Sequence, residues 1–231
     1  MDEEKTARKH FNHDAGVYDD YIVKIIPFYW EMIEALMETV PFPVDEKIEV
    51  LDLGCGTGAV TRQITERFPR ANVTALDVAE NMLAVARERL QDCSNIDFVA
   101  GDVSEMEFKE KYDLIVSALA LHHLPTDEHK RENYRCIFEA LKTGGIFINA
   151  DTVTGASEHL QNLYQEKWKE FMRLHMSEEE IEEKWLPRHR QEDSPAPLSK
   201  HLHWLQEVGF QNVDVTWKYY KLAVFSGTCY R

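Results

Sequence analysis

The sequence predicts an α/β protein whose core is a doubly wound, mostly parallel sheet of seven strands with an antiparallel hairpin at its C-terminal end. Three observations lead to this class. Between residues 48 and 150, short β-rich runs alternate with stretches of helical periodicity. A glycine-rich loop joins the first such run to the helix that follows it. Two further β-rich runs, separated by a tight turn, lie near the end of the chain.

Each element follows from its local pattern, in chain order. Apolar side chains such as Tyr18, Ile22, Met32 and Leu36 recur at helical spacing on both sides of Pro27, so two helices are expected before the first strand. Core strands are expected at 48–53, 71–76, 96–100, 112–117 and 146–150, with helices at 59–68, 80–90 and 128–141. The remaining elements are a long charged helix at 157–184, a polar loop at 188–197, a helix at 198–208 and strands at 210–217 and 220–226.

Composition and charge exclude several classes of protein. With 231 residues, 44% hydrophobic and 29% charged, the chain has the make-up of one globular domain. A net charge of −15 opposes non-specific binding to nucleic acid and to anionic membranes. The sequence has neither a membrane-length apolar run nor a secretory signal, so a cytoplasmic protein is expected. The four cysteines are scattered without C-x-x-C pairing, so neither a disulfide framework nor a metal site is expected.

The strongest motif is the segment Val50–Gly58, in which Gly54, Gly56 and Gly58 recur at every second position around Cys55. Glycine permits positive φ and lets a ligand approach the backbone closely. The helix that follows offers unpaired N–H groups and a positive dipole end, which suit a carboxylate. The loop also fits the dinucleotide-binding fingerprint, so its surroundings must decide between ligands.

Three acids surround this loop in the predicted sheet. Asp52 precedes the loop by two residues, where it could hold an ammonium group, and Asp77 ends the second strand, where an acid can bind two ribose hydroxyls. Asp102 follows the third strand, where an acid or its neighbouring amide can meet an adenine amino group. Alone, each acid fits a turn or a helix cap. Together they indicate a nucleoside ligand with an amino-acid tail.

This constellation resembles the class I S-adenosylmethionine-dependent methyltransferases over about residues 48–148, and the closing hairpin fits their antiparallel last strand. The resemblance implies a Rossmann-like methyltransferase fold with S-adenosylmethionine as cofactor. It assigns the methionine part to Asp52 and the glycine loop, the ribose to Asp77, and the adenine to the pair after the third strand. The residues implied to bind cofactor are Asp52, Gly54, Cys55, Gly56, Gly58, Asp77, Val78, Met82, Asp102, Val103 and Ser117.

Residues 11–32, which contain Ile26-Pro-Phe-Tyr, and residues 198–225 are similar to the carboxy-S-adenosylmethionine synthases of tRNA wobble-uridine modification. That resemblance implies that Tyr29 contacts the cofactor. The synthases hold the extra carboxylate of their cofactor with an arginine before a Gly-Phe pair, where this chain has Trp204. Lys200, one turn earlier, is a cation that could replace it. The loop itself has the ordinary methyltransferase form, so we expect plain S-adenosylmethionine.

Several other side chains are candidates for chemistry, each with a structural alternative. His122 and His123 follow the fourth strand near the expected pocket and are candidate bases, although they also fit a packing role. Tyr18 and Tyr21 fit an aromatic lid or a helix interface. The segment Arg188–Arg190 fits an anion-binding site or a solvated loop.

We therefore expect one methyltransferase domain over residues 1–231, which transfers a methyl group to a small molecule or to tRNA. Its segments are a helical cap (1–43), a cofactor-binding core (44–151), a helical acceptor region (152–197) and a last helix with the hairpin (198–231). A homodimer is compatible with the apolar stripe of the acceptor region, which consists of Trp168, Phe171 and Met172 at helical spacing. The alternatives are an enzyme that modifies S-adenosylmethionine, like the synthases, a non-catalytic module that binds it, and an NAD-linked oxidoreductase, which does not explain Asp102.

Overall fold

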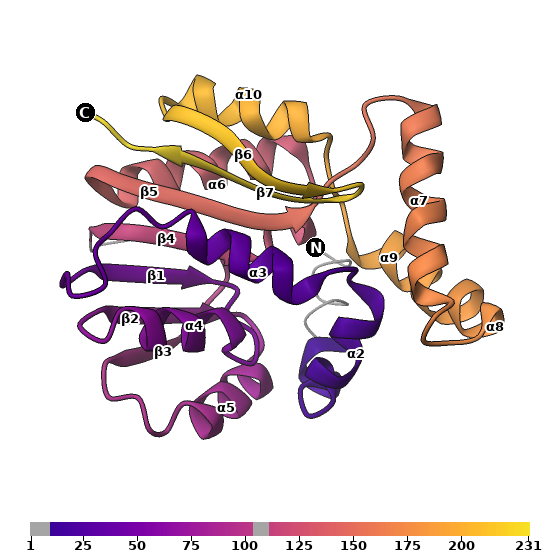
Figure 1. Cartoon of the computed structure of the whole chain (residues 1–231), viewed down its shortest axis with the longest axis horizontal. Helices are drawn as coiled ribbons and strands as arrows, with labels where there is room; N and C mark the ends of the chain where they lie inside the picture. The colour runs from indigo at the N-terminus through magenta and orange to yellow at the C-terminus, as the bar shows by residue number, and fades with distance from the viewer. Residues whose placement is uncertain (1–9, 104–110) are drawn as a thin grey trace.

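The computed structural model describes residues 10–103 and 111–231, and its strands form one mixed sheet (Figure 1). The strands are β1 (Glu49–Leu53), β2 (Asn72–Asp77), β3 (Ile96–Ala100), β4 (Tyr112–Ala118), β5 (Leu141–Thr152), β6 (Gln211–Tyr219) and β7 (Leu222–Thr228). The main helices are α2 (Tyr18–Ile25), α3 (Tyr29–Glu38), α4 (Ala59–Arg67), α5 (Glu80–Arg89), α6 (Asp127–Ala140), α7 (Glu158–Met172), α9 (Leu186–Glu192) and α10 (Leu198–Val208). Shorter turns are η1 (Leu121–His123), α8 (Glu178–Glu180) and η2 (Ile181–Trp185).

The sheet has seven strands in the order β3-β2-β1-β4-β5-β7-β6, with β7 antiparallel to both of its neighbours. This confirms the doubly wound sheet with a C-terminal hairpin. The parallel strands are in register, with Leu53 opposite both Leu76 and Ser117, and Asp77 opposite Ala100. The carboxyl ends of β1, β2, β3 and β4 therefore meet at one edge, where ligands bind in open α/β sheets.

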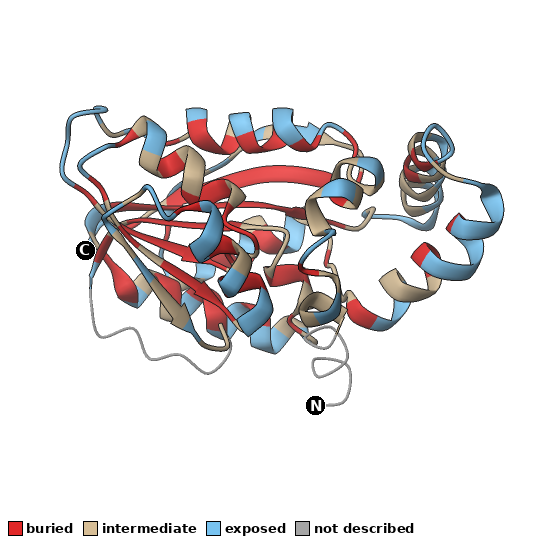
Figure 2. Cartoon of the chain, turned by 90° about the horizontal axis from the view of Figure 1, so that it is seen from below, coloured by how far each residue is buried: buried red, intermediate tan, exposed pale blue. Residues whose placement is uncertain are grey.

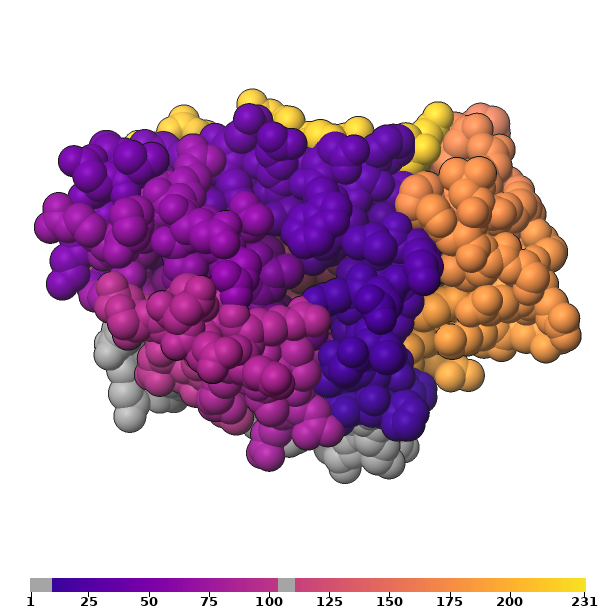
Figure 3. All heavy atoms as spheres, turned by 60° about the horizontal axis from the view of Figure 1, so that its bottom comes forward, coloured from indigo at the N-terminus to yellow at the C-terminus, as the bar shows by residue number. Residues whose placement is uncertain are grey.

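Two apolar cores cover the two faces of the sheet. The central strands are largely buried between the helices, whereas the edge strands β3 and β6 are more exposed (Figure 2). One core packs α3 and α4 against the sheet through residues such as Leu36 and Ile64. The other packs α6 and α10 through residues such as Tyr134 and Leu205. A smaller cluster joins α2, α7, η2 and α9 beyond the carboxyl ends of the strands, around Trp168 and Trp185. Figure 3 shows the N-terminal segment lying between the sheet domain and these last helices.

The region after β5 differs from the expected long helix and loop. The helical stretch breaks after Met172, and a new one begins at Glu178. Its N-cap is Ser177, whose side chain accepts a hydrogen bond from the N–H of Glu180. It continues through a π-helical turn into α9, so Arg188–Glu192 is helical and not a loop. Pro187 is tolerated because it lies in the first turn of α9. None of the helices in the described residues has the length and apolarity needed to cross a membrane.

Candidate functional site

A cavity of about 780 Å³, counted to its open mouth, lies at the carboxyl ends of β1, β2 and β4. We name it the first cavity. Of the residues expected to bind cofactor, it is lined by Gly54, Gly56, Asp77, Val78, Met82, Asp102 and Val103. Its remaining walls come from the N-terminal segment and from the turn after β4. The sheet thus brings together residues from three separate strand ends, as the motif predicted.

The glycine loop shows which of its glycines leaves room for a ligand. All three have positive φ, +73° at Gly54, +54° at Gly56 and +85° at Gly58. A Cβ added to Gly54 would lie 2.3 Å from Ala120 Cβ, and one added to Gly58 would lie 2.7 Å from Leu90 Cδ1. A Cβ on Gly56 would meet nothing within 4 Å. Gly54 and Gly58 therefore serve the packing of the protein, whereas Gly56 lines open space that a ligand can enter.

The Asp77 carboxylate connects the end of β2 to this loop. Its two oxygens accept hydrogen bonds of 2.8 Å from the backbone N–H groups of Gly56 and Ala79. Burial raises the pKa of Asp77, while these backbone N–H groups lower it. The side chain is 9% exposed and lines the first cavity. A carboxylate oxygen has two lone-pair directions, so Asp77 can also accept hydrogen bonds from ligand hydroxyls.

The other five expected residues lie outside the lining of the first cavity. Asp52 is buried beneath the loop and accepts a 2.6 Å hydrogen bond from Thr61 Oγ1. Ser117 donates to the carbonyl of Leu53, and Tyr29, the first residue of α3, packs in the core. Also outside the lining are Cys55 and Gly58. Burial raises the pKa of the Cys55 thiol, which disfavours a reactive thiolate. Cofactor contacts by these five residues stay predictions.

The buried Asp52 carboxyl gives a prediction for stability against pH. Burial raises its pKa from 3.8 to about 7, although the hydrogen bond from Thr61 lowers it. A raised folded-state pKa means that Asp52 stabilises the fold below pH 4 and that this contribution is lost as the pH rises through 7. Asp52→Asn stays neutral and should be more stable than the parent above pH 7, by at most about 4 kcal/mol.

Urea unfolding of the ligand-free protein at pH 4, 6 and 8 would measure this effect. We expect the difference between Asp52→Asn and the parent to grow with pH. Asp97→Asn, an exposed position on β3, is the control and should show no such trend. A difference for Asp52→Asn that is the same at every pH would contradict the assignment.

A second cavity, of about 640 Å³, adjoins the first and shares four lining residues with it: Phe11, Tyr18, Leu119 and His123. Its apolar side is built from α2, α7 and η2 by Tyr21, Ile22, Ile25, Trp168 and Trp185. Its polar side consists of His122, Thr152, Arg188, His189, Glu192, Asp193 and Lys221. Tyr18, expected in an aromatic lid, thus lies at the boundary of the two cavities, and Tyr21 lines the second.

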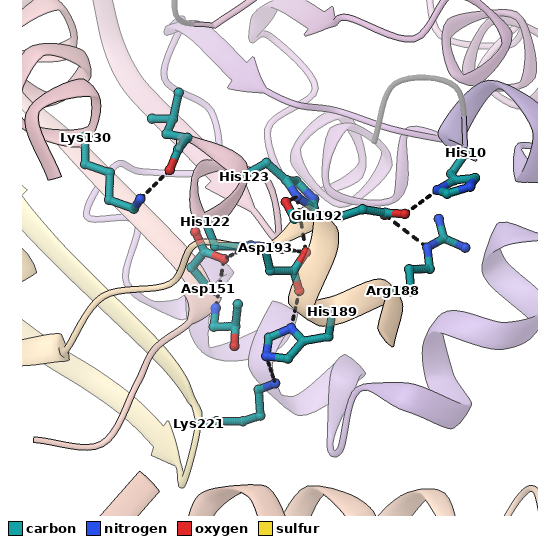
Figure 4. Close-up of polar contacts among 12 residues, drawn as sticks. His10, His122, His123, Lys130, Asp151, Arg188, His189, Glu192, Asp193 and Lys221 are labelled. Carbon is teal, nitrogen blue, oxygen red and sulfur yellow. Dashed lines mark hydrogen bonds and ion pairs between the residues drawn. The ribbon is translucent and has the colours of Figure 1, made fainter. Parts of the chain in front are cut away.

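The polar side of the second cavity is an ion-pair network centred on Asp193 (Figure 4). Asp193 Oδ1 lies 3.6 Å from His122 Nε2 and 3.3 Å from His123 Nδ1, and Oδ2 contacts His189 Nδ1. The other nitrogen of His122 lies 2.5 Å from Asp151 Oδ1. Burial lowers the pKa of His122, but the carboxylates of Asp151 and Asp193 outweigh burial and raise it to about 10. The raised pKa favours the imidazolium form of His122, which has no free lone pair to accept a proton, so His123 is the stronger candidate base of the two.

The same network contains three side chains whose ligand atoms are close enough together to hold a metal ion. In the described part of the chain, the ligand atoms of His122, His123 and Asp193 all lie within 4.8 Å of one another. The sequence did not reveal Asp193 as a third ligand, because it lies 70 residues from His123 in a segment expected to be a loop. A sequence signal was present in the spacing of His189 and Asp193, four residues apart on one helical face. The expectation that the chain holds no metal stays a prediction.

The resemblance places Trp204, with Lys200 one turn earlier, at the carboxylate-binding position of the synthases, and this assignment stays a prediction. Trp204 lies on α10, is 6% exposed and packs in the core with Leu205 and Phe225. Lys200 pairs with Asp127. Neither side chain lines either cavity.

The arginine that does line the second cavity is Arg188. It donates hydrogen bonds to Asp14 Oδ2 at 2.6 Å and to Glu192 Oε2 at 3.0 Å. Its position within α9, and not in a solvated loop, brings it to the cavity.

Comparison with known proteins agrees with this geometry. Residues 50–145 match a family model described as a methyltransferase domain. A malonyl-[acyl-carrier protein] O-methyltransferase of Acetivibrio thermocellus is 35% identical over 117 residues, which cover 51% of this chain and 40% of the relative. A carboxy-S-adenosyl-L-methionine synthase of Shewanella baltica is 28% identical over 220 residues, which cover 92% of this chain and 88% of the relative.

Solved structures share the fold. A complex of DhpI with SAM and HEP superimposes with a TM-score of 0.68 at 19% identity and covers 96% of both chains. The chain spans only 40% to 57% of the length of the malonyl-[acyl-carrier protein] O-methyltransferases that it matches.

Proposed function

We propose that this chain, which belongs to the class I S-adenosylmethionine-dependent methyltransferases, binds S-adenosylmethionine in the first cavity and methylates a small molecule in the second. The observation that carries the proposal is the wall shared by the two cavities, built by Phe11, Tyr18, Leu119 and His123. These four residues mark the boundary at which the two cavities adjoin, so a methyl donor in the first and an acceptor in the second would meet there, and closeness of the reacting groups is the main requirement of this displacement.

The residues of the first cavity fit this cofactor. Asp77 would bind the ribose hydroxyls, and the open space at Gly56 would admit the ligand beside the loop. Val78 and Met82 would pack on the adenine ring, with Asp102 and Val103 at its edge. When bound, the cofactor supplies an activated methyl group on a sulfonium. The protein must then orient the acceptor, exclude water and, for a hydroxyl or amine acceptor, remove a proton.

His123 is the side chain we assign to proton removal. It lines both cavities, and its Nδ1 lies 3.0 Å from the carbonyl oxygen of Glu192, so the ring is held at the shared wall. Its ring also packs on those of His122 and Phe11, at centroid distances of 4.0 and 5.2 Å. The neighbouring cationic His122 would stabilise the Asp193 carboxylate without taking a proton itself.

Formation of S-adenosylhomocysteine from S-adenosylmethionine tests this function. The purified chain would be assayed with pooled small-molecule acceptors and, in parallel, with tRNA. We expect turnover with a small molecule, and His123→Asn should lower kcat roughly 100-fold while cofactor affinity changes little. An exposed histidine, His203→Asn, is the control. Turnover with tRNA alone, or an unchanged kcat in His123→Asn, would contradict the proposal.

A second candidate is modification of S-adenosylmethionine itself, as the name of the synthase relative implies. Two observations favour it: the similarity to that relative covers 92% of this chain, and Arg188 lines the cavity that adjoins the cofactor site. Against it, the Arg188 guanidinium already binds the carboxylates of Asp14 and Glu192, which neutralise it. Mass spectrometry of the adenosyl product separates the two candidates, because a carboxylated cofactor and S-adenosylhomocysteine differ in mass.

We assign a role to each segment on the same basis. The core at 44–151 would bind the cofactor, and the segments 1–43 and 152–197 would build the acceptor cavity. A small molecule fits a cavity with an apolar side and a polar side such as this one, whereas tRNA would have to overcome the net charge of −15. A cytoplasmic location and a homodimer are part of the proposal. A non-catalytic module would have no need of the second cavity.

A further inference from the structure

Lys221 is a buried cation on the polar side of the second cavity (Figure 4). It lies at the turn between β6 and β7 and is 9% exposed. Its Nζ lies 3.6 Å from the centroid of the Trp168 ring and 3.4 Å from His189 Nε2. Of the carboxylates in the described residues, none lies within 4 Å of Nζ, so Lys221 has no direct counterion there.

The other cations of this cavity are paired. Arg188 binds Asp14 and Glu192, and His122 binds Asp151. A buried charge without a partner is costly, and proteins pair or neutralise such groups. Burial lowers the pKa of Lys221 to about 8, although the Asp193 carboxylate opposes this, so most of the charge remains at neutral pH. Lys221 is therefore the cation of this cavity without a carboxylate in direct contact, and the Asp193 carboxylate acts on it only at longer range.

Three side chains that line the same cavity, Tyr21, Thr152 and Trp185, have a buried polar atom without a hydrogen-bond partner in the described part of the chain. Thr152 is 4% exposed, and its hydroxyl oxygen has no hydrogen-bond partner among the described residues. It pairs with Leu222 across the sheet, next to Lys221, and the following N–H of Val153 donates to the Lys221 carbonyl. Trp185 is 5% exposed, and its indole N–H is likewise unpartnered in the described chain. An ammonium, a hydroxyl and an indole N–H can all donate, so the ligand must supply acceptor atoms.

We propose that Lys221 and Thr152 bind a carboxylate of the methyl acceptor, which is an organic acid with a flat apolar body. The carboxylate would accept hydrogen bonds from the Lys221 ammonium and the Thr152 hydroxyl, and would give Lys221 a carboxylate in direct contact. The body would pack on the side chains of Ile22, Ile25 and Trp185, which line the apolar side.

Lys221 lines the second cavity but not the wall shared with the first. The bound carboxylate is therefore an anchor, and the methylated atom lies elsewhere on the acceptor, beside His123. This inference rests on the proposed function, because it takes the second cavity to be the acceptor site.

Calorimetric titration with pairs of probes tests the inference. The chain is first titrated with S-adenosylhomocysteine and, once saturated, with acetate, benzoate, phenylacetate and indole-3-acetate, each compared with its neutral amide and with phenyl phosphate. We expect at least one aromatic acid to bind 10-fold or more tightly than its amide. Lys221→Met should remove this preference, and Thr152→Val should reduce it. The matched control is Lys218→Met, an exposed lysine of the same hairpin that contacts Tyr164 and Tyr220.

The comparison of acids with amides in the parent needs no variant, so a folding defect in Lys221→Met would not prevent the test. If none of the acids binds more tightly than its amide, or if Lys221→Met keeps the preference, the inference is overturned. Tighter binding of phenyl phosphate than of every carboxylate would overturn the choice of a carboxylate. A chain that binds S-adenosylhomocysteine without preferring acids contradicts this inference alone, whereas a chain that does not bind S-adenosylhomocysteine contradicts the proposed function.

Discussion

Gly56→Val is expected to abolish binding of S-adenosylhomocysteine while leaving the fold intact. At Gly56 the φ angle is +54°, and an added Cβ would project into open space at the first cavity. No protein atom lies within 4 Å of the new Cβ, so the Cβ itself clashes with no part of the protein. It does occupy the space through which the ligand approaches the loop. We expect a loss of at least about 100-fold in affinity, or roughly 2.7 kcal/mol, by calorimetry.

The matched control for this variant is Gly144→Val. Gly144 also has positive φ, +85°, and a Cβ there would likewise meet nothing within 4 Å. The two substitutions impose a similar backbone cost, on the order of 1–2 kcal/mol, but Gly144 lines neither cavity. Both should lower the Tm, and only Gly56→Val should lose the ligand. Equal affinities in the two variants would show that the loop is structural only.

Asp77→Ala is expected to weaken cofactor binding by roughly 2–4 kcal/mol, because charge-assisted hydrogen bonds to the ribose are lost in a closed site. The variant also removes the acceptors of the Gly56 and Ala79 N–H groups, which hold the loop in place. Asp77→Asn keeps one acceptor oxygen and separates the two effects. Its amide nitrogen would face the other backbone N–H, so it should be less stable than the parent but more stable than Asp77→Ala, and it should still bind more weakly.

The control for Asp77 is Asp97→Ala on the neighbouring strand β3, where the side chain is exposed and lines neither cavity. Its dissociation constant for S-adenosylhomocysteine should equal that of the parent. An unchanged dissociation constant in both Asp77 variants would refute the ribose-binding role.

The sheet and the first cavity could be predicted from the sequence because their signals are local. Each core strand is a short β-rich run, and the glycine loop and the acid at the end of β2 are placed by counting from strand ends. Parallel register then brings these ends together without further information. The sequence pattern gave a wrong start for the fifth strand, because a pair of glycines can either precede a strand or lie within an irregular one. Gly144 and Gly145 were expected to precede the fifth strand, but β5 begins at Leu141 and contains them in a stretch where its register with β4 shifts.

The second cavity could not be predicted because its residues come from distant segments. Asp193, His189 and Lys221 meet His122 only after α9 and the C-terminal hairpin are in place. The resemblance to the synthases also could not predict which side of α10 packs against the sheet. Trp204 was placed near the cofactor by analogy, but its side of the helix packs against the sheet, and burial of a large indole in the core stabilises that orientation. The expectation of plain S-adenosylmethionine rests on the form of the glycine loop and not on the orientation of Trp204.

A crystal structure of the chain grown with S-adenosylhomocysteine tests the central claim most directly, that two adjoining cavities place a methyl donor against an acceptor. The account predicts the nucleoside in the first cavity, with its ribose against Asp77 and its sulfur facing the wall of Phe11, Tyr18, Leu119 and His123. A first cavity without the ligand, or a sulfur that faces away from the second cavity, would contradict it.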